Sequence, residues 1–284
     1  MPLALILGSH VAGSRVGGTL ASLALAQSPM KIDPVHVPTT LLGRHPGWGP
    51  PGGGPVSPDL FAGMLEGIAA NGLFALVDGV LTDYFASAEQ VQIAARAIDA
   101  VKSANPKAIV LVDPVLGDAP GGLYVGQGVA DALGEYLVPR ADFLTPNLWE
   151  LGYLTQTSPK DLQQIHHAAT ALGRPSLISS VEKDGEIGSL LVDGSRAWLS
   201  THPKSPAPPK GTGDLMATMF LAHLIDHKAA PQAMALALAG VSYVVDRAAV
   251  WHAPELPMVA AGYEAWRAEP LALTELGSTV QMGL

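Results

Sequence analysis

The sequence predicts an α/β fold in which helices cover both faces of a mainly parallel sheet. Short apolar runs of strand length alternate along the chain with amphipathic stretches of helix length, as in β-α-β units. The short runs carry almost no charge, which is typical of strands buried on both faces. The 284 residues, 48% of them hydrophobic, can build a sizeable core, and no repeat or clear domain boundary divides them. We therefore expect a single domain over residues 1–284.

The expected strands and helices follow from these patterns. The strands are Leu3 to Leu7, Phe74 to Val77, Ala108 to Val112, Phe143-Leu144 and Leu177-Ile178. One helix is expected to begin at Ser57, with apolar residues at helical spacing as far as Ile68. Another begins with Ser87 and Gln90, which suit a capping box, and ends before Pro106.

Two segments interrupt this alternation. Residues 43–58 form a long Gly/Pro loop, for which a functional cover and a mobile insertion are equally open interpretations. Residues 183–202 place Asp193-Gly194 between two apolar runs, which predicts an antiparallel hairpin. Long alanine-rich helices are expected after it, to about residue 248.

Composition excludes several classes of protein. Sixteen Lys and Arg against 25 Asp and Glu give a net charge of −9, which argues against a nucleic-acid partner. The absence of Cys excludes disulfides, thiolate metal sites and cysteine nucleophiles. No run of about 18 uncharged apolar residues predicts a membrane span, and the first residues lack a basic region, so no signal peptide is expected. We expect a cytoplasmic protein with no membrane partner.

Residues 211–214, Gly-Thr-Gly-Asp, begin a strongly periodic helix and are the most informative segment. Two glycines let the backbone turn with its amides pointing one way, and amides at a helix N-terminus bind phosphate. Asp214 has a structural interpretation as an N-cap residue and a chemical one as a general base beside an anion hole. A cap does not require Gly-x-Gly before it, which favours the chemical interpretation.

Two more motifs follow predicted strands. Asp113 and Asp118, in Asp-Pro-Val-Leu-Gly-Asp, are costly at the end of a buried strand unless hydrogen bonds or a cation offset their charge. Magnesium held through water beside substrate phosphates would do so. The second motif runs from Thr145 to Glu150, Thr-Pro-Asn-Leu-Trp-Glu, in which Asn147 and Glu150 also suit a capping box. Both interpretations of that motif stay open.

The three motifs, in the order Asp-Pro-Val-Leu-Gly-Asp, Thr-Pro-Asn-x-x-Glu and Gly-Thr-Gly-Asp, resemble those of the pyridoxal kinases in the ribokinase-like superfamily. The likeness spans about residues 5–225 and includes Ser9-His-Val, Gly122-Leu-Tyr-Val and Ile178-Ser-Ser. The resemblance implies a ribokinase-like three-layer αβα sandwich. It also implies transfer of the γ-phosphoryl group of magnesium-ATP to the 5′-hydroxymethyl group of pyridoxal, in vitamin B6 salvage.

The resemblance assigns roles position by position. For catalysis, it implies a base and a set of amides that stabilise the transferring phosphoryl group: Asp214, with Gly211, Thr212 and Gly213. For the hydrated metal, it implies Asp118 and Glu150, supported by Asp113. For ATP, it implies Asp113, Tyr124, Thr145, Asn147 and Ser180; for the vitamin, Ser9, His45 and Tyr84 beside Asp214.

Departures from the family pattern lie on the substrate side. Arg44-His45-Pro46 stands where the family has Asn-His-Thr, so a hydroxyl donor is missing. Thr82-Asp83-Tyr84 stands where it has Thr-Gly-Tyr, which puts a carboxylate in place of a glycine. Gly13-Ser14-Arg15 replaces a glycine-aromatic run. The half of the site that transfers phosphate matches the family, whereas the vitamin pocket is altered.

Two alternatives therefore stay open. The first is a kinase of a related small alcohol, such as a hydroxymethylpyrimidine or a sugar. The second is a catalytically weak protein that binds pyridoxal phosphate, although the intact Gly-Thr-Gly-Asp argues against it because a pure binder needs no base. The resemblance also implies a homodimer, and it leaves open the use of a monovalent cation such as K⁺.

Overall fold

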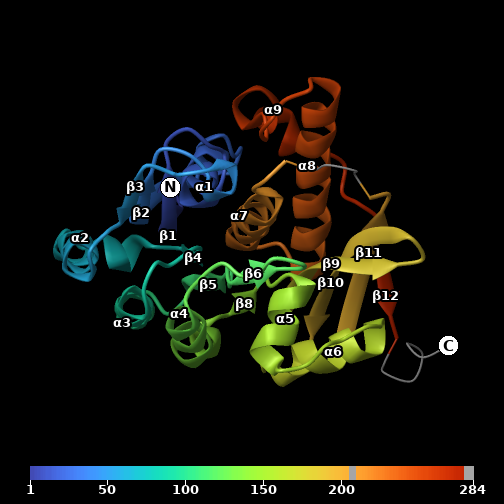
Figure 1. Cartoon of the computed structure of the whole chain (residues 1–284), viewed down its shortest axis with the longest axis horizontal. Coiled ribbons are helices and arrows are strands. Elements are labelled where there is room, and N and C mark those ends of the chain that lie inside the picture. The colour runs from blue at the N-terminus through green and yellow to red at the C-terminus, as the bar shows by residue number, and fades with distance from the viewer. Residues whose placement is uncertain (205–208, 278–284) are drawn as a thin grey trace.

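The chain folds around one large sheet, as the computed structural model shows for residues 1–204 and 209–277 (Figure 1). In the described residues this sheet has ten strands. In spatial order they are β12 (Thr274–Leu276), β11 (Arg196–His202), β10 (Glu186–Asp193), β9 (Ser176–Lys183), β8 (Phe143–Leu144), β5 (Ile109–Val112), β4 (Gly79–Thr82), β1 (Leu3–Val11), β2 (Asp33–Leu42) and β3 (Gly53–Pro55). The six strands from β9 to β2 are parallel and the outer ones pair antiparallel, so the predicted mainly parallel sheet is confirmed.

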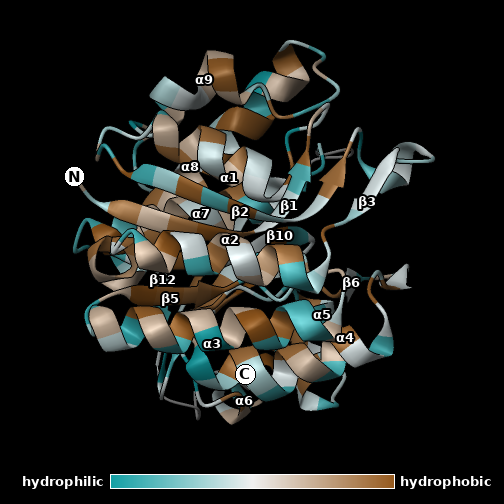
Figure 2. Cartoon of the chain, turned by 90° about the vertical axis from the view of Figure 1, so that its left-hand side faces the viewer, coloured by the Kyte–Doolittle hydropathy of each residue, from teal (hydrophilic) through white to brown (hydrophobic). Residues whose placement is uncertain are grey.

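Helices cover both faces of the sheet. Their bounds are α1 (Gly17–Ala26), α2 (Pro58–Ala70), α3 (Ala88–Ala104), α4 (Gln127–Ala132), α5 (Leu148–Thr155), α6 (Leu162–Ala171), α7 (Thr212–Ile225), α8 (Ala230–Val250) and α9 (Met258–Ala265). Helices α1, α7, α8 and α9 pack on one face over one apolar cluster. Helices α2 to α6 pack on the other face over two, one beneath α2 to α4 and one beneath α5 and α6. Figure 2 shows the apolar strand β5 in brown beside α3, along which brown and teal residues alternate.

The local predictions are largely confirmed. Helix α2 begins after Ser57, whose side chain accepts the amide of Leu60, and the hairpin of β10 and β11 closes at Asp193-Gly194. Helix α3 begins as predicted, with the Ser87 side chain accepting the Gln90 amide. The second half of that capping box is wrong, because the Gln90 side chain accepts the amide of Ala86, one residue before Ser87.

The strand predicted at Phe74 to Val77 is wrong. Residues Leu73–Leu76 form a turn of 3-10 helix, and the strand begins later, at Gly79. Phe74 and Val77 are buried while Leu76 is 62% exposed, so burial recurs at a spacing of three. That spacing is typical of a 3-10 turn, in which side chains three residues apart share a face.

The Gly/Pro loop of residues 43–58 is partly structured. Pro46–Trp48 form a 3-10 turn, and β3 pairs antiparallel with the end of β2 at the edge of the sheet. Charges of Lys210 and Glu255 act on the His45 ring within this loop. The loop therefore reaches toward the segment that precedes α7.

Helix α8 is long and apolar enough, by length and composition, to cross a membrane. In the fold it packs against α7 and α9, and its buried side chains belong to the core of that face. Its apolar character is accounted for by this packing.

Candidate active site

The carboxyl ends of neighbouring parallel strands form one row of residues at the edge of the sheet. Strand pairing aligns Leu7 of β1 with the last residues of β4, β5 and β8. The residues that follow therefore lie side by side: Gly8, Asp83, Asp113 and Thr145. Ligands of α/β proteins bind outside this edge of the sheet. The predicted site residues Asp113 and Thr145 are thus brought together, with Asp83 beside them.

Asp214 lies in the first turn of α7 and reaches across to the start of α1. Its Oδ2 accepts the backbone amide of Gly17 at 2.8 Å, so the carboxylate is not simply the N-cap of its own helix. The residue at the N-cap position is Gly211. Burial, and next the charge of Asp83, raise the pKa of Asp214 to about 7. A carboxylate with such a pKa is well suited to accept a proton near neutral pH.

The turn before Asp214 requires glycine. Gly211 has φ +91°, and a Cβ there would lie 2.5 Å from the backbone oxygen of Arg15. The turn brings Gly211 close against the segment that precedes α1, and the first amides of α7 have no partner within their own helix. Such amides and the helix dipole favour the binding of an anion, which is the role predicted from the sequence for residues 211–213.

Glu150 forms the capping box that its motif allowed. The Asn147 side chain accepts the Glu150 amide at 2.9 Å, and Glu150 Oε2 accepts the Asn147 amide at 2.8 Å. The other oxygen, Oε1, accepts the amide of Leu116 at 2.9 Å and more weakly that of Gly117. Glu150 is 5% exposed and therefore joins α5 to the loop after β5. Burial raises its pKa to about 7.

The negative charge of this cluster is not balanced by the protein. Burial and the charges of Glu150 and Asp214 raise the pKa of Asp113 well above its usual value. None of the ion pairs among the described residues involves Asp113, Glu150 or Asp214. The buried Thr145 hydroxyl lies next to the Asp113 carboxyl and makes no well-formed hydrogen bond within the described chain. These residues fit a site that is completed by a cation.

No three His, Asp or Glu side chains of the described residues form a ready metal site by themselves. This fits magnesium, which keeps several waters and takes one or two carboxylates in addition to substrate phosphates. Asp118, half-buried in the two-residue strand β6 (Gly117–Asp118), lies beside Tyr124. Partial burial and the neighbouring Asp118 raise the pKa of Tyr124, which is 53% exposed.

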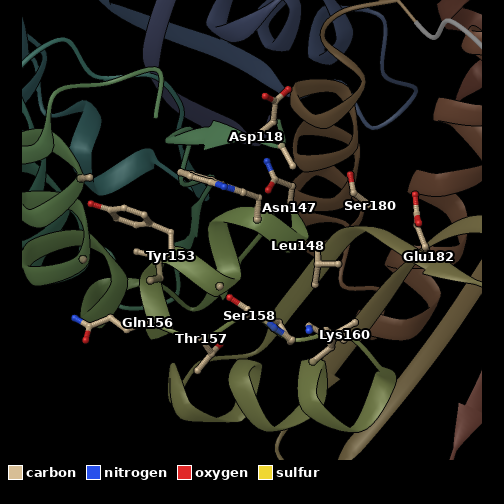
Figure 3. Close-up of a pocket in the computed structure, with 18 of the residues that line it drawn as sticks. Asp118, Asn147, Leu148, Tyr153, Gln156, Thr157, Ser158, Lys160, Ser180 and Glu182 are labelled. Carbon is tan, nitrogen blue, oxygen red and sulfur yellow. The ribbon is translucent and has the colours of Figure 1, made fainter. Parts of the chain in front are cut away.

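A groove of about 1240 Å³ brings three of the predicted residues together. Asp118, Asn147 and Ser180 lie at one end of it (Figure 3), and Asn147 donates to the backbone oxygen of Gly117. Ser180 is exposed and has φ +61°. The groove continues along α5 to Lys160 and does not include Asp214.

The residues predicted to bind the vitamin lie near the β1 and β4 end of the row formed by Gly8, Asp83, Asp113 and Thr145, on the side away from the groove. Ser9, at the end of β1, is buried and donates its amide and its hydroxyl to Asp83 Oδ2, at 2.9 and 3.1 Å. Tyr84 follows Asp83 and is half-buried. His45 accepts the Gly47 amide and packs against Trp48, with ring centroids 5.7 Å apart. The hydroxyl of Ser9 is therefore already committed within the protein.

Two site features were not predicted from the sequence. The Gly17 amide orients Asp214, and the Asp83 carboxylate binds Ser9 and the Gly18 amide. The paired glycines that begin α1 could have indicated a carboxylate-binding helix start. A carboxylate directly after a buried strand is a second signal, the one already used for Asp113.

Comparison with known proteins places this chain in a class of small-molecule kinases. The family model described as phosphomethylpyrimidine kinase matches residues 77–256. The fold matches a putative phosphomethylpyrimidine kinase from Bacteroides thetaiotaomicron, at 20% identity and a TM-score of 0.87 over 97% of this chain and 98% of that one. It also matches a pyridoxal kinase from Leishmania donovani in complex with ADP and pyridoxamine, at 24% identity and a TM-score of 0.89, over 97% of this chain and all of that one.

Similar sequences identify the particular family within these small-molecule kinases. Pyridoxal kinase PdxY of Leifsonia xyli is 34% identical over 229 residues, which is 78% of this chain and 80% of that protein. A pyridoxine/pyridoxal/pyridoxamine kinase of Bordetella avium is 36% identical over 225 residues, 76% of this chain and 75% of that one. The chain belongs to the pyridoxal kinase family and has its ribokinase-like fold, as the resemblance implied.

Proposed function

We propose that this protein transfers the γ-phosphoryl group of ATP to the 5′-hydroxymethyl group of pyridoxal, with pyridoxine and pyridoxamine as further acceptors. The observation that carries the proposal is the start of α7, where Asp214 stands behind a Gly-Thr-Gly turn and is held by the Gly17 amide. The relatives named as pyridoxal kinases supply the class of acceptor.

Asp214 acts as the general base in this proposal. The acceptor hydroxyl gives its proton to the carboxylate while its oxygen attacks the γ-phosphorus, and ADP leaves. The Gly17 amide occupies Asp214 Oδ2 and leaves the other oxygen for the acceptor. A base must be ionised to act, so a pKa of about 7 predicts that kcat/KM rises with pH through neutrality.

The amides of residues 211–213 stabilise the charge that develops on the transferring phosphoryl group. They are fixed by the helix and need no rearrangement during the reaction, which is how such donors contribute most. Magnesium, when bound, neutralises charge on the phosphate oxygens of ATP. Asp118 and Glu150 would hold its water shell, with Asp113 supporting them. Thr145, Asn147 and Ser180 would contact the phosphates, and Tyr124 the nucleotide.

The direct test is product identification by mass spectrometry. The protein is incubated with magnesium-ATP and pooled pyridoxal, pyridoxine and pyridoxamine, and then with each separately. Formation of pyridoxal 5′-phosphate that depends on ATP supports the proposal. ADP release only with another alcohol would contradict the assignment of the acceptor while leaving the kinase intact.

A second candidate acceptor is a hydroxymethylpyrimidine. The family model that matches is described as phosphomethylpyrimidine kinase, and Pro46 and Asp83 alter the pocket side of the site. Steady-state ADP release with a hydroxymethylpyrimidine, a sugar and pyridoxal, compared as kcat/KM, separates these acceptors. A homodimer and a cytoplasmic location are further parts of the proposal, drawn from the family. Size-exclusion chromatography with light scattering tests the dimer.

The metal assignment leads to a prediction for Asp118 and Glu150. Asp118→Asn and Glu150→Gln should each raise the magnesium concentration needed for half-maximal rate, since each removes charge near a hard cation. The control is Asp131→Asn, an exposed carboxylate on the same groove that binds Gln127, for which no change is expected. If Glu150→Gln lowers only the melting temperature, Glu150 acts through its capping box alone.

The Pro46 substitution leads to another prediction. Proline provides no side-chain donor and no amide, and a missing neutral hydrogen bond costs about 0.5–1.5 kcal/mol, or up to about tenfold in affinity. Pro46→Thr should therefore lower the KM for pyridoxal with little effect on kcat, as a uniform binding contact does. Trp48→Ala should raise the KM if Trp48, which is 43% exposed, covers the bound vitamin.

Pro50→Thr serves as the matched control for that experiment. It makes the same change four residues later on the same exposed loop and should leave the KM unchanged. An unchanged KM in both Pro46→Thr and Trp48→Ala would show that residues 43–49 do not contact the acceptor.

A further inference from the structure

The start of helix α1 holds two carboxylates that are distant in sequence. The Gly17 amide donates to Asp214 Oδ2 at 2.8 Å, and the next amide, of Gly18, donates to Asp83 Oδ2 at 3.1 Å. The residue at the N-cap, Val16, supplies no side-chain cap. Asp83 and Asp214 therefore perform the capping of α1 together, from neighbouring amides of one turn.

The space around Asp83 is fitted to a carboxylate. A Cβ at Gly8 would lie 2.4 Å from Asp83 Oδ2, and one at Gly17 would lie 2.7 Å from it. Oδ2 also accepts the amide and the hydroxyl of Ser9, so it receives three hydrogen bonds in a side chain that is 5% exposed. Two glycines and three donors surround this one oxygen. Asp83 is consequently part of the framework that connects β1, β4 and α1.

The titratable groups that face Asp83 do not neutralise it. On its own segment it faces Tyr84, across the row Asp113, and from α7 Asp214. From β2 it faces His36, whose ring nitrogen Nε2 hydrogen-bonds with the backbone oxygen of Gly8. The ring centroids of His36 and of His10 on β1 are 6.0 Å apart. Burial lowers the pKa of His36, so that ring is neutral at neutral pH.

We propose that Asp83 is a positioning residue for the base: it holds the turn that orients Asp214, and its charge controls when Asp214 can accept a proton. This rests on the proposed role of Asp214. When Asp83 is ionised, a second negative charge on the same helix turn is unfavourable, so Asp214 retains its proton to higher pH. Removal of the Asp83 charge should let Asp214 ionise at lower pH.

The experiment compares Asp83→Asn and Asp83→Gly with Asp78→Asn. Asp78 precedes β4 and accepts the Leu3 amide at the other end of β1, so it is the same kind of residue on the same strand pair, remote from Asp214. For each variant, kcat/KM with magnesium-ATP and pyridoxal is measured from pH 5 to pH 9. We expect the acid limb to move down by roughly one pH unit in both Asp83 variants and to stay unmoved in Asp78→Asn.

Thermal unfolding without substrate gives a second readout. Burial raises the folded-state pKa of Asp83, and burial and then the charge of Asp83 raise that of Asp214. The contribution of both groups to stability is therefore full below the unfolded pKa, near 4, and is lost as pH rises. The fall in melting temperature between pH 5 and pH 8 should therefore be smaller in the Asp83 variants than in the wild type and in Asp78→Asn.

The outcomes separate the two proposals. An acid limb that stays in place in active Asp83 variants overturns the role of Asp83, and so does failure of both variants to fold, which would assign it to the framework alone. A wild type inactive on pyridoxal contradicts the proposed acceptor instead. The profiles are then measured with the alcohol that it does phosphorylate, and the unfolding comparison stands without any substrate.

Discussion

Asp214→Ala is expected to lower kcat by about 10²–10⁴-fold, the usual contribution of a general base, in a protein that still folds. The carboxylate receives one hydrogen bond, from the Gly17 amide, and it is not part of the apolar core on either face. Its loss removes the proton acceptor, while the remaining first turn of α7 still presents its amides. Some stability should even be regained at pH 8, because a buried carboxylate whose pKa is raised destabilises the fold once it ionises.

The measurement is steady-state ADP release, with circular dichroism to establish folding. Asp226→Ala is the matched control, since Asp226 follows the other end of α7, where it pairs with Lys228, and should retain wild-type turnover. Near-normal turnover in folded Asp214→Ala would show that the carboxylate only caps the start of α1.

Gly211→Ala is expected to have the second largest effect, lowering both kcat and the melting temperature. At φ +91° an alanine is strained by about 1–3 kcal/mol, and its Cβ would lie 2.5 Å from the Arg15 oxygen, a backbone atom that cannot rotate away. The turn must shift, and the amides behind it shift with it. Removal of one such donor typically costs about 10²–10³-fold in kcat, and displaced amides should lower kcat toward that range.

Gly213→Ala makes the matched comparison for stability. Gly213 has no positive φ, and a Cβ there would meet no atom within 4 Å. The melting temperature of the Gly213→Ala variant should therefore match that of the wild type. Differential scanning calorimetry of the two variants checks this difference. Equal melting temperatures would mean that the contact between residues 211 and 15 does not constrain the turn.

The sequence predicted those parts of the fold that depend on short-range patterns. The sheet class, the start of α2 at Ser57 and the hairpin at Asp193-Gly194 each follow from spacing and turn chemistry within a few residues. The strand predicted at Phe74 to Val77 was wrong because a short strand and a 3-10 turn can both consist of four apolar residues. Only the burial pattern in the folded protein distinguishes them.

The site was predictable only in part for a related reason. Asp113 and Asp214 each stand next to a recognisable local motif. No local motif indicates the contacts of Asp83. They join this residue, which follows β4, to Ser9 and Gly18, which are 74 and 65 positions away in the sequence. They depend on which residues of β1 and β4 pair, and that register appears only in the folded sheet.

The bond between Gly17 and Asp214 also has a consequence for the order in which the protein matures. It joins residues 197 positions apart, which makes it one of the most distant contacts of the chain. During synthesis, β1, α1 and the central strands leave the ribosome before α7 is made. The Gly17 amide in the first turn of α1 is therefore capped by Asp214 only after α7 has been synthesised. Closing so long a loop is entropically unfavourable until the intervening strands have paired. The Asp214 carboxylate is therefore held by the Gly17 amide only when nearly the whole chain has folded. A partly folded chain lacks a correctly oriented base.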